Sequence, residues 1–162
     1  MKSRFAKSLT LIALAASLAA CSSVNLDDKA AGAGAGTDSS QIMDPFNPKS
    51  PLAQQRSVYF DFNSYTVDDK YRGVVDMHGK YLLATPAQRV VIEGNTDARG
   101  GAEYNLALGQ RRAEAVRRML TVIGVPDTQV ETISFGKEKP KALGDTEADY
   151  AENRRADFSY KR

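Results

Sequence analysis

The chain has 162 residues, a length that suits one folded domain with a modest core and leaves no room for a second one once the atypical N-terminal third is set aside. Its 22 lysines and arginines nearly balance 20 aspartates and glutamates, and no basic block suggests a nucleic-acid surface. The single cysteine excludes an intramolecular disulfide, so packing alone must hold the fold.

Residues 1–20 have the layout of a secretory signal peptide. Basic residues near the start precede an apolar run from Leu9 to Ala20, which is too short for a transmembrane helix. The run ends in Leu-Ala-Ala-Cys21, which resembles the bacterial lipobox; the resemblance implies cleavage before Cys21 and acylation of that cysteine. Several acyl chains together form a stable membrane anchor. An ordinary secretory signal with a chance cysteine is the alternative.

Residues 21–56 follow as a lipidated cysteine and a predicted flexible linker. Ser22 stands where the inner-membrane retention signal of such lipoproteins has an aspartate, so we expect anchoring in the outer membrane with the domain facing the periplasm. Cleavage would remove three basic residues and change the formal charge from +2 to about −1. The segment is rich in alanine, glycine, serine and proline and shows no apolar period, which is typical of a linker.

The folded domain is expected over residues 57–162. A first strand is predicted at 58–62, where Val58, Phe60 and Phe62 would share one side. A helix should open near Thr66 and stop before Pro86, although two glycines weaken it. A nearly continuous apolar strand, as expected for one buried on both faces, is predicted at 89–93.

The clearest predicted element is a helix from about Ala102 to Ile123. Apolar residues from Leu106 onward recur there at spacings of three and four, and Gly124 ends the pattern. A third strand at 130–135, a short helix at 146–153 and a last strand at 156–160 complete the chain. Strands alternating with helices predict an α/β sandwich of one sheet with helices packed against it.

Six short motifs occur in an order that is typical of one family. They are Val58-Tyr59-Phe60-Asp61-Phe62, Glu93-Gly94-Asn95-Thr96-Asp97 with Arg99-Gly100, Glu103-Tyr104-Asn105, Leu108-Gly109-Gln110-Arg111-Arg112-Ala113, Phe135-Gly136-Lys137-Glu138-Lys139-Pro140 and Asn153-Arg154-Arg155-Ala156. With the lipobox, they resemble the peptidoglycan-associated lipoproteins, whose folded part is an OmpA-like domain. The resemblance implies a mixed four-stranded sheet in β-α-β-α-β-(α)-β order and noncovalent binding of peptidoglycan through its meso-diaminopimelate.

The resemblance also implies a biological role without catalysis or a cofactor. Such proteins link the outer membrane to the cell wall with TolB and other Tol proteins, supporting envelope integrity and constriction during cell division. A wall-binding OmpA-like lipoprotein with a different partner is the alternative. Against an enzyme, the only histidine, His78, has helical spacing among apolar residues, Cys21 would carry lipid, and no carboxylate cluster has metal-site spacing.

In the family, a loop carboxylate and an arginine of the following helix hold the zwitterionic end of diaminopimelate. Alignment of the motifs assigns these roles to Asp97 and Arg112. Helical periodicity independently places Arg112 beside the apolar stripe and Arg111 on the outer side. Asp97 lies in a glycine-flanked loop after a buried strand, a common position for ligand contacts. A purely structural ion pair between Asp97 and Arg112 is the alternative.

Further residues are second choices for contacts with the ligand: Thr96, Asn105, Phe60, Asp61, Leu108 and Arg154. Thr96 could equally hold the loop, Phe60 could be a core residue, and Leu108 could contribute its backbone. Arg154, in the segment Asn153-Arg154-Arg155, could instead belong to a solvated charge run. Asn95 and Ala98 differ from the common family residues, so no side-chain contacts are assigned to them.

Overall fold

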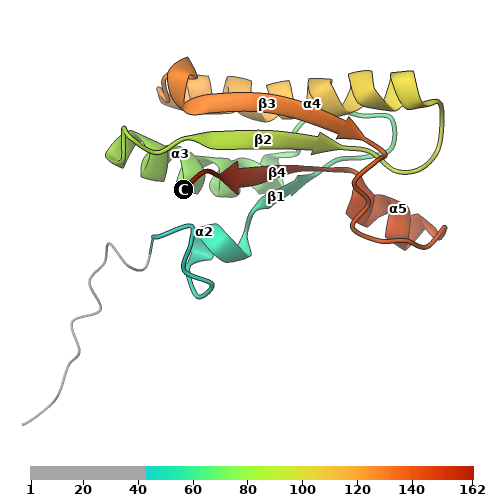
Figure 1. Cartoon of the computed structure of the whole chain (residues 1–162), viewed down its shortest axis with the longest axis horizontal. Coiled ribbons are helices and arrows are strands. Elements are labelled where there is room, and N and C mark those ends of the chain that lie inside the picture. Colours follow the sequence, from blue (N-terminus) through green and yellow to red (C-terminus); the bar gives the residue numbers. More distant parts are fainter. Residues whose placement is uncertain (1–42) are drawn as a thin grey trace, which may run out of the picture. The chain divides into compact units, whose positions relative to one another are not determined.

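The computed structural model describes residues 43–162, so the predicted signal peptide, Cys21 and the first part of the predicted linker lie outside the described residues. The domain is built on one four-stranded sheet with strand order β1-β4-β2-β3 (Figure 1). The strands are β1 (Ser57–Tyr59), β2 (Val90–Asn95), β3 (Val130–Gly136) and β4 (Arg155–Tyr160). β4 runs antiparallel to both β1 and β2, whereas β3 is parallel to β2. The predicted mixed α/β fold is confirmed.

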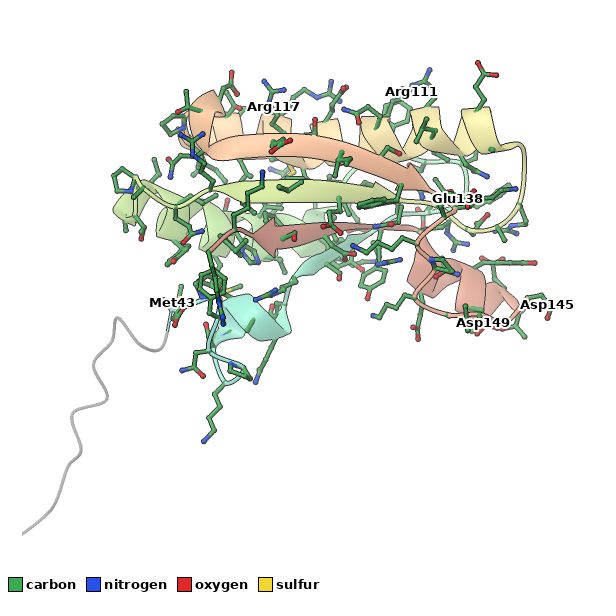
Figure 2. All side chains as sticks on the ribbon, in the orientation of Figure 1. Met43, Arg111, Arg117, Glu138, Asp145 and Asp149 are labelled. Carbon is green, nitrogen blue, oxygen red and sulfur yellow. The ribbon has the colours of Figure 1, made fainter. Side chains whose placement is uncertain are left out.

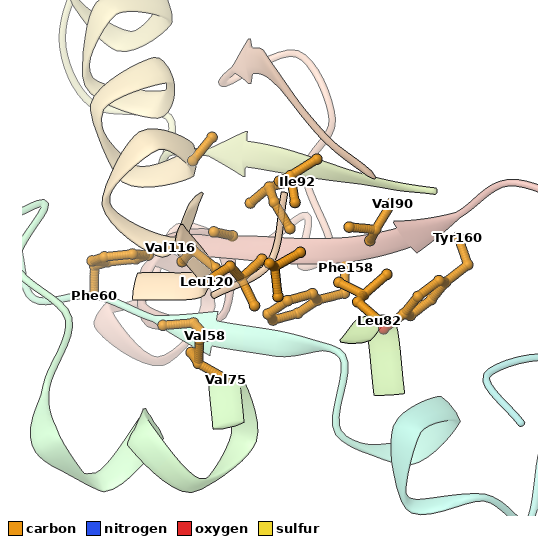
Figure 3. Close-up of a cluster of buried hydrophobic side chains, with 14 residues drawn as sticks. Val58, Phe60, Val75, Leu82, Val90, Ile92, Val116, Leu120, Phe158 and Tyr160 are labelled. Atoms are coloured by element: carbon orange, nitrogen blue, oxygen red, sulfur yellow. The ribbon is translucent and has the colours of Figure 1, made fainter. Parts of the chain in front are cut away.

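Two long helices, α3 (Arg72–Ala84) and α4 (Ala102–Ile123), pack on the same face of the sheet (Figure 1). Their shared core contains Val75 and Leu82 from α3 and Val116 and Leu120 from α4, gathered around Phe158 of β4 (Figure 3). Shorter elements are α2 (Pro51–Gln54), α5 (Glu147–Asn153) and the 3-10 turns η1 (Asp69–Tyr71) and η2 (Asp127–Gln129). Within residues 43–162, no helix combines the length and apolar character needed to cross a membrane.

Two facing glycines let α4 approach β2 closely. A Cβ atom at Gly94 of β2 would lie only 1.8 Å from the carbonyl oxygen of Gly109 in α4. A Cβ atom at Gly109 would lie 2.3 Å from Oγ of Ser134 in β3. Only glycine fits such a backbone approach. The contact holds the N-terminal half of α4, including Arg112, against the end of β2.

The first strand and the first long helix differ from their predicted bounds. β1 ends at Tyr59 rather than continuing to Phe62, whose side chain is 61% exposed. The predicted buried side of the strand therefore includes Val58 and Phe60 but not Phe62. Helix α3 follows η1, and the carboxylate of Asp68, not the predicted Thr66, caps this region by accepting a hydrogen bond from Lys70 N.

Residues 43–56, here called the tether root, fold onto the domain, so the flexible-linker prediction is wrong for them. Ser50 caps α2, Pro51 occupies its first position, and Leu52 is fully buried. The backbone oxygen of Gln55 lies 2.8 Å from Nε2 of His78. The helix-capping serine, the proline at the first helical position and the buried leucine are local features that the overall composition of the segment does not indicate.

The tether root and the loop after β2 lie at opposite ends of the sheet. The ring of Phe46 packs edge-on against Tyr160, with ring centroids 6.5 Å apart. Tyr160 pairs with Val90 at the beginning of β2, whereas Asp97 follows the other end of that strand (Figure 1). At about 3.3 Å per residue, β2 separates these two regions by roughly 20 Å.

Candidate ligand-binding site

A pocket of about 180 Å³ lies at the C-terminal end of β2. Three segments form it: the loop after β1, the loop after β2 and the first turns of α4. Its lining residues are Phe62, Asn63, Thr96, Asp97, Arg99, Gly100, Tyr104, Asn105, Leu108 and Arg112. The structure thus brings together two charged residues singled out from the sequence, Asp97 and Arg112, with three of the second choices: Thr96, Asn105 and Leu108.

Arg112 is a fully buried cation surrounded by neutral oxygen atoms. Its Nε donates to the carbonyl of Ser64 at 2.8 Å, Nη1 to that of Asn95 at 2.8 Å, and Nη2 to that of Asp61 at 3.2 Å. Burial lowers the pKa of Arg112 to about 10, so the guanidinium keeps its charge at neutral pH. These bonds use three of five N–H groups, leaving donors for an anionic ligand.

Asp97 is 4% exposed and accepts bonds from two other arginines. Its Oδ2 lies 2.6 Å from Nη2 of Arg99 and 3.4 Å from Nη1 of Arg154. Its Oδ1 accepts a bond from the backbone N–H of Arg99 at 3.1 Å. Burial acts to raise the pKa of Asp97, but the hydrogen bonds from Arg99 outweigh it and hold that pKa below its ordinary value.

Asp97 and Arg112 line one pocket but form no ion pair with each other. The purely structural pairing considered from the sequence is therefore absent. The pocket instead presents a carboxylate and a guanidinium as separate charged groups. This arrangement matches a ligand that carries both an ammonium and a carboxylate group.

Two of the second-choice residues stabilise the loop after β2. Thr96 donates from its backbone N–H to the carbonyl of Gly136 at 2.8 Å and from Oγ1 to the carbonyl of Asp97 at 3.2 Å. Asn105, which is 1% exposed, donates from Nδ2 to the carbonyl of Arg99 at 2.9 Å. Both side chains therefore hold the loop that carries Asp97, the alternative already considered for Thr96.

Phe60, Asp61 and Arg154 line a neighbouring pocket of about 340 Å³ and not the pocket of Asp97. Phe60 is 5% exposed and belongs to the hydrophobic core (Figure 3), as the core interpretation predicted. Arg154 is 7% exposed and donates to Phe60 O at 3.0 Å and to Glu147 at 2.8 Å. Its Nη1 also lies 3.4 Å from Oδ2 of Asp97. The interpretation of Arg154 as part of a solvated run of charges is therefore wrong.

Helical periodicity gave the correct orientation for the arginines of α4 but not for its first apolar residue. Arg112 is buried, whereas Arg111 is exposed and projects from the outer side of α4 (Figure 2). Leu106 is 52% exposed, contrary to its predicted place in the buried stripe. At the start of α4 the buried positions are Asn105 and Leu108, because that end of the helix faces the pocket.

Arg99 is the charged lining residue that was not identified from the sequence. Its guanidinium carbon lies 4.2 Å from the ring centroid of Phe62 and 4.3 Å from that of Tyr150. Nη1 forms an ion pair with Glu147 at 3.2 Å, in addition to the pair with Asp97. The only sequence feature that could have indicated Arg99 was its position two residues after Asp97. Its role depends on contacts with residues far away in the sequence.

The described residues contain no group of three or more histidine, cysteine, aspartate or glutamate side chains arranged to hold a metal ion.

Comparison with known proteins places the fold in a family. Residues 59–154 match the OmpA family. A peptidoglycan-associated lipoprotein of Haemophilus influenzae is 46% identical, covering 97% of this chain and 99% of that protein. One from Pseudomonas aeruginosa is 37% identical, covering 96% of each chain.

The crystal structure of the peptidoglycan-associated lipoprotein from Burkholderia pseudomallei is similar, with a TM-score of 0.70 and 59% identity. The match covers 73% of this chain and 100% of that chain. The C-terminal domain of Helicobacter pylori MotB, at 20% identity and a TM-score of 0.61, shares the fold. The sheet and helices therefore define an OmpA-like domain. The chain belongs to the OmpA family and, within it, to the peptidoglycan-associated lipoproteins.

Proposed function

We propose that this protein is an outer-membrane lipoprotein that binds diaminopimelate-type peptidoglycan noncovalently in the pocket at the end of β2. The observation that carries the proposal is that buried Asp97 and buried Arg112 line one pocket without pairing with each other. The free end of diaminopimelate in a peptide stem carries one ammonium and one carboxylate. Each charge-assisted bond to such a group contributes about 1.5–3 kcal/mol.

The binding test compares sacculus pull-down by the full chain and its variants. Asp97→Asn and Arg112→Ala should each lower affinity about 30-fold or more, because each leaves a ligand charge unpaired in a buried site. Arg111→Ala is the control, since its side chain is exposed on the outer side of α4. Circular dichroism must first confirm folding, because Arg112 joins three backbone segments. Wild-type binding by folded variants would place the site elsewhere.

A second comparison tests the ligand class. Peptidoglycan with lysine in place of diaminopimelate lacks the side-chain carboxylate that Arg112 is proposed to hold. The wild-type chain should therefore retain much less lysine-type than diaminopimelate-type wall, whereas Arg112→Ala should bind both poorly. Equal retention of the two walls by the wild-type chain would contradict the assigned role of Arg112.

Anchoring and partners form the rest of the proposal. Acylation of Cys21 would hold the protein in the outer membrane, with the domain in the periplasm, and TolB with other Tol proteins would be its partners in envelope integrity and cell division. Cys21→Ser should abolish labelling by palmitate and release the protein from membranes. Persistent outer-membrane fractionation of this variant would contradict lipid anchoring. Pull-down with TolB distinguishes the Tol role from that of a wall-binding lipoprotein with another partner.

A further inference from the structure

Asp97 already has two cationic partners, and this affects how it could receive the ammonium of a ligand. The guanidinium groups of Arg99 and Arg154 both contact the same oxygen atom, Oδ2. A third cation beside them would meet two like charges. Like charges only a few ångströms apart in a partly buried site repel each other strongly. A ligand ammonium can therefore approach Asp97 favourably only if one arginine withdraws.

Arg154 is fixed in place. It is 7% exposed, and its guanidinium also donates to the carbonyl of Phe60 at 3.0 Å and to Glu147 at 2.8 Å. Withdrawing it would leave a buried backbone acceptor without its bond, which is costly. Arg154 therefore stays with Asp97 whatever else binds there.

Arg99 is free to leave by comparison. Its side chain is 35% exposed, and it lies in the loop between β2 and α4 next to Gly100, which has a positive φ of 89°. The ring of Phe62 on which it stacks is itself 61% exposed. Within residues 43–162, its buried Nε finds no acceptor, so the arrangement also leaves one donor unsatisfied. Its other ion-pair partner, Glu147, is 65% exposed, so that pair contributes little, and the cost of moving this cation into solvent comes mainly from the contact with Tyr150.

We propose that Arg99 is a displaceable internal cation that occupies the carboxylate of Asp97 and is exchanged for the ammonium of the bound ligand. This inference rests on the proposed function. Arg99 then affects specificity. The ligand ammonium contributes to binding only the difference in free energy between its own bond to Asp97 and the bond from Arg99 that it replaces. The gain from the ligand carboxylate at Arg112 is not reduced in this way. Removing the charge of Arg99 should therefore strengthen selection for ligands that carry an ammonium.

The test compares two small probes by calorimetric titration of the full chain in mild detergent. The probes are meso-diaminopimelate and pimelate, which has the same carbon chain and both carboxylates but no ammonium. Arg99→Gln should bind diaminopimelate about two- to five-fold more tightly than wild type, the range expected for releasing a partly exposed ion pair. It should bind pimelate equally or more weakly, so the ratio of the two affinities rises.

Two further variants control this result. Arg117→Gln removes another partly exposed arginine and its 3.2 Å ion pair with Asp127, on the outer part of α4 (Figure 2), and should leave both affinities unchanged. Arg99→Lys keeps a cation beside Asp97 and should restore the wild-type ratio. The inference is overturned if Arg99→Gln weakens diaminopimelate binding or leaves the ratio unchanged while wild type binds. If wild type itself binds no diaminopimelate, the proposed function is contradicted, and so is this inference, which rests on it.

Discussion

Replacing Gly94 with alanine should destabilise the domain strongly, because the new methyl group has no room. Its Cβ would lie 1.8 Å from the carbonyl oxygen of Gly109, and contacts under 3.0 Å are essentially never observed. The backbones of β2 and α4 must therefore separate by more than 1 Å. Overpacking costs about 1–3 kcal/mol, and we expect the upper end because no flexible side chain can move aside.

Thermal unfolding followed by circular dichroism measures this effect. A loss of about 3 kcal/mol should lower the Tm by roughly 10 °C or more in a domain of this size. Ligand binding should fall as well, since the same movement separates Arg112 from the carbonyl of Asn95 that it contacts at 2.8 Å. Gly73→Ala is the matched control: apart from its chain neighbours and the nearby backbone of its own helix, no atom lies within 4 Å of the new methyl group, and alanine favours helix by up to about 1 kcal/mol. Equal Tm values for Gly94→Ala and wild type would refute the close approach of α4 to β2.

Two further predictions concern stability at the other end of the sheet. Leu52→Ala should lower the free energy of unfolding by about 2–3 kcal/mol in urea titrations, whereas Leu143→Ala, at a position 90% exposed, should change it little; equal effects would mean that the tether root does not pack. Burial lowers the pKa of His78 to about 4, so native His78 stays neutral while the unfolded chain takes up a proton below about pH 6.5. The free energy of unfolding should therefore fall by about 3 kcal/mol as the pH drops from 6.5 to 4, and the decrease should be smaller in His78→Gln. If the two proteins show the same dependence of unfolding free energy on pH, the buried neutral state of His78 is contradicted.

The elements with a complete local signal were predicted closely. Helix α4 spans Ala102–Ile123 as expected, because its apolar period is long and Gly124 ends it in the left-handed conformation that glycine readily adopts. The end of β1 was not predicted, since aromatic alternation continues to Phe62 although that ring lies on the surface beside Arg99. The tether root was missed for the opposite reason: a proline-rich, polar segment packs through Leu52 and Phe46 and through a hydrogen bond between Gln55 and His78, residues far apart in the chain.

The site was predictable only in part. Motif alignment pointed to both Asp97 and Arg112, the loop after a buried strand supported Asp97, helical periodicity supported Arg112, and the structure places both in one pocket. The role of Arg99 depends on Phe62 and Tyr150, which lie 37 residues before it and 51 after it in the numbering. No local pattern encodes such a contact. The sequence therefore identifies charged residues of the site better than it identifies which of them form ion pairs with one another.

The position of the tether root opposite the pocket has a mechanical consequence. A membrane anchor upstream of Phe46 and a wall ligand beside Asp97 would pull the domain from its two ends, nearly along the strands. Hydrogen bonds in an antiparallel ladder lie across the strands, so such a pull loads the bonds between β2 and β4 in shear. Several bonds then share the force, whereas a pull from one end would open them one at a time. With the proposed anchor and the proposed wall ligand in place, the domain would therefore transmit tension along its strands.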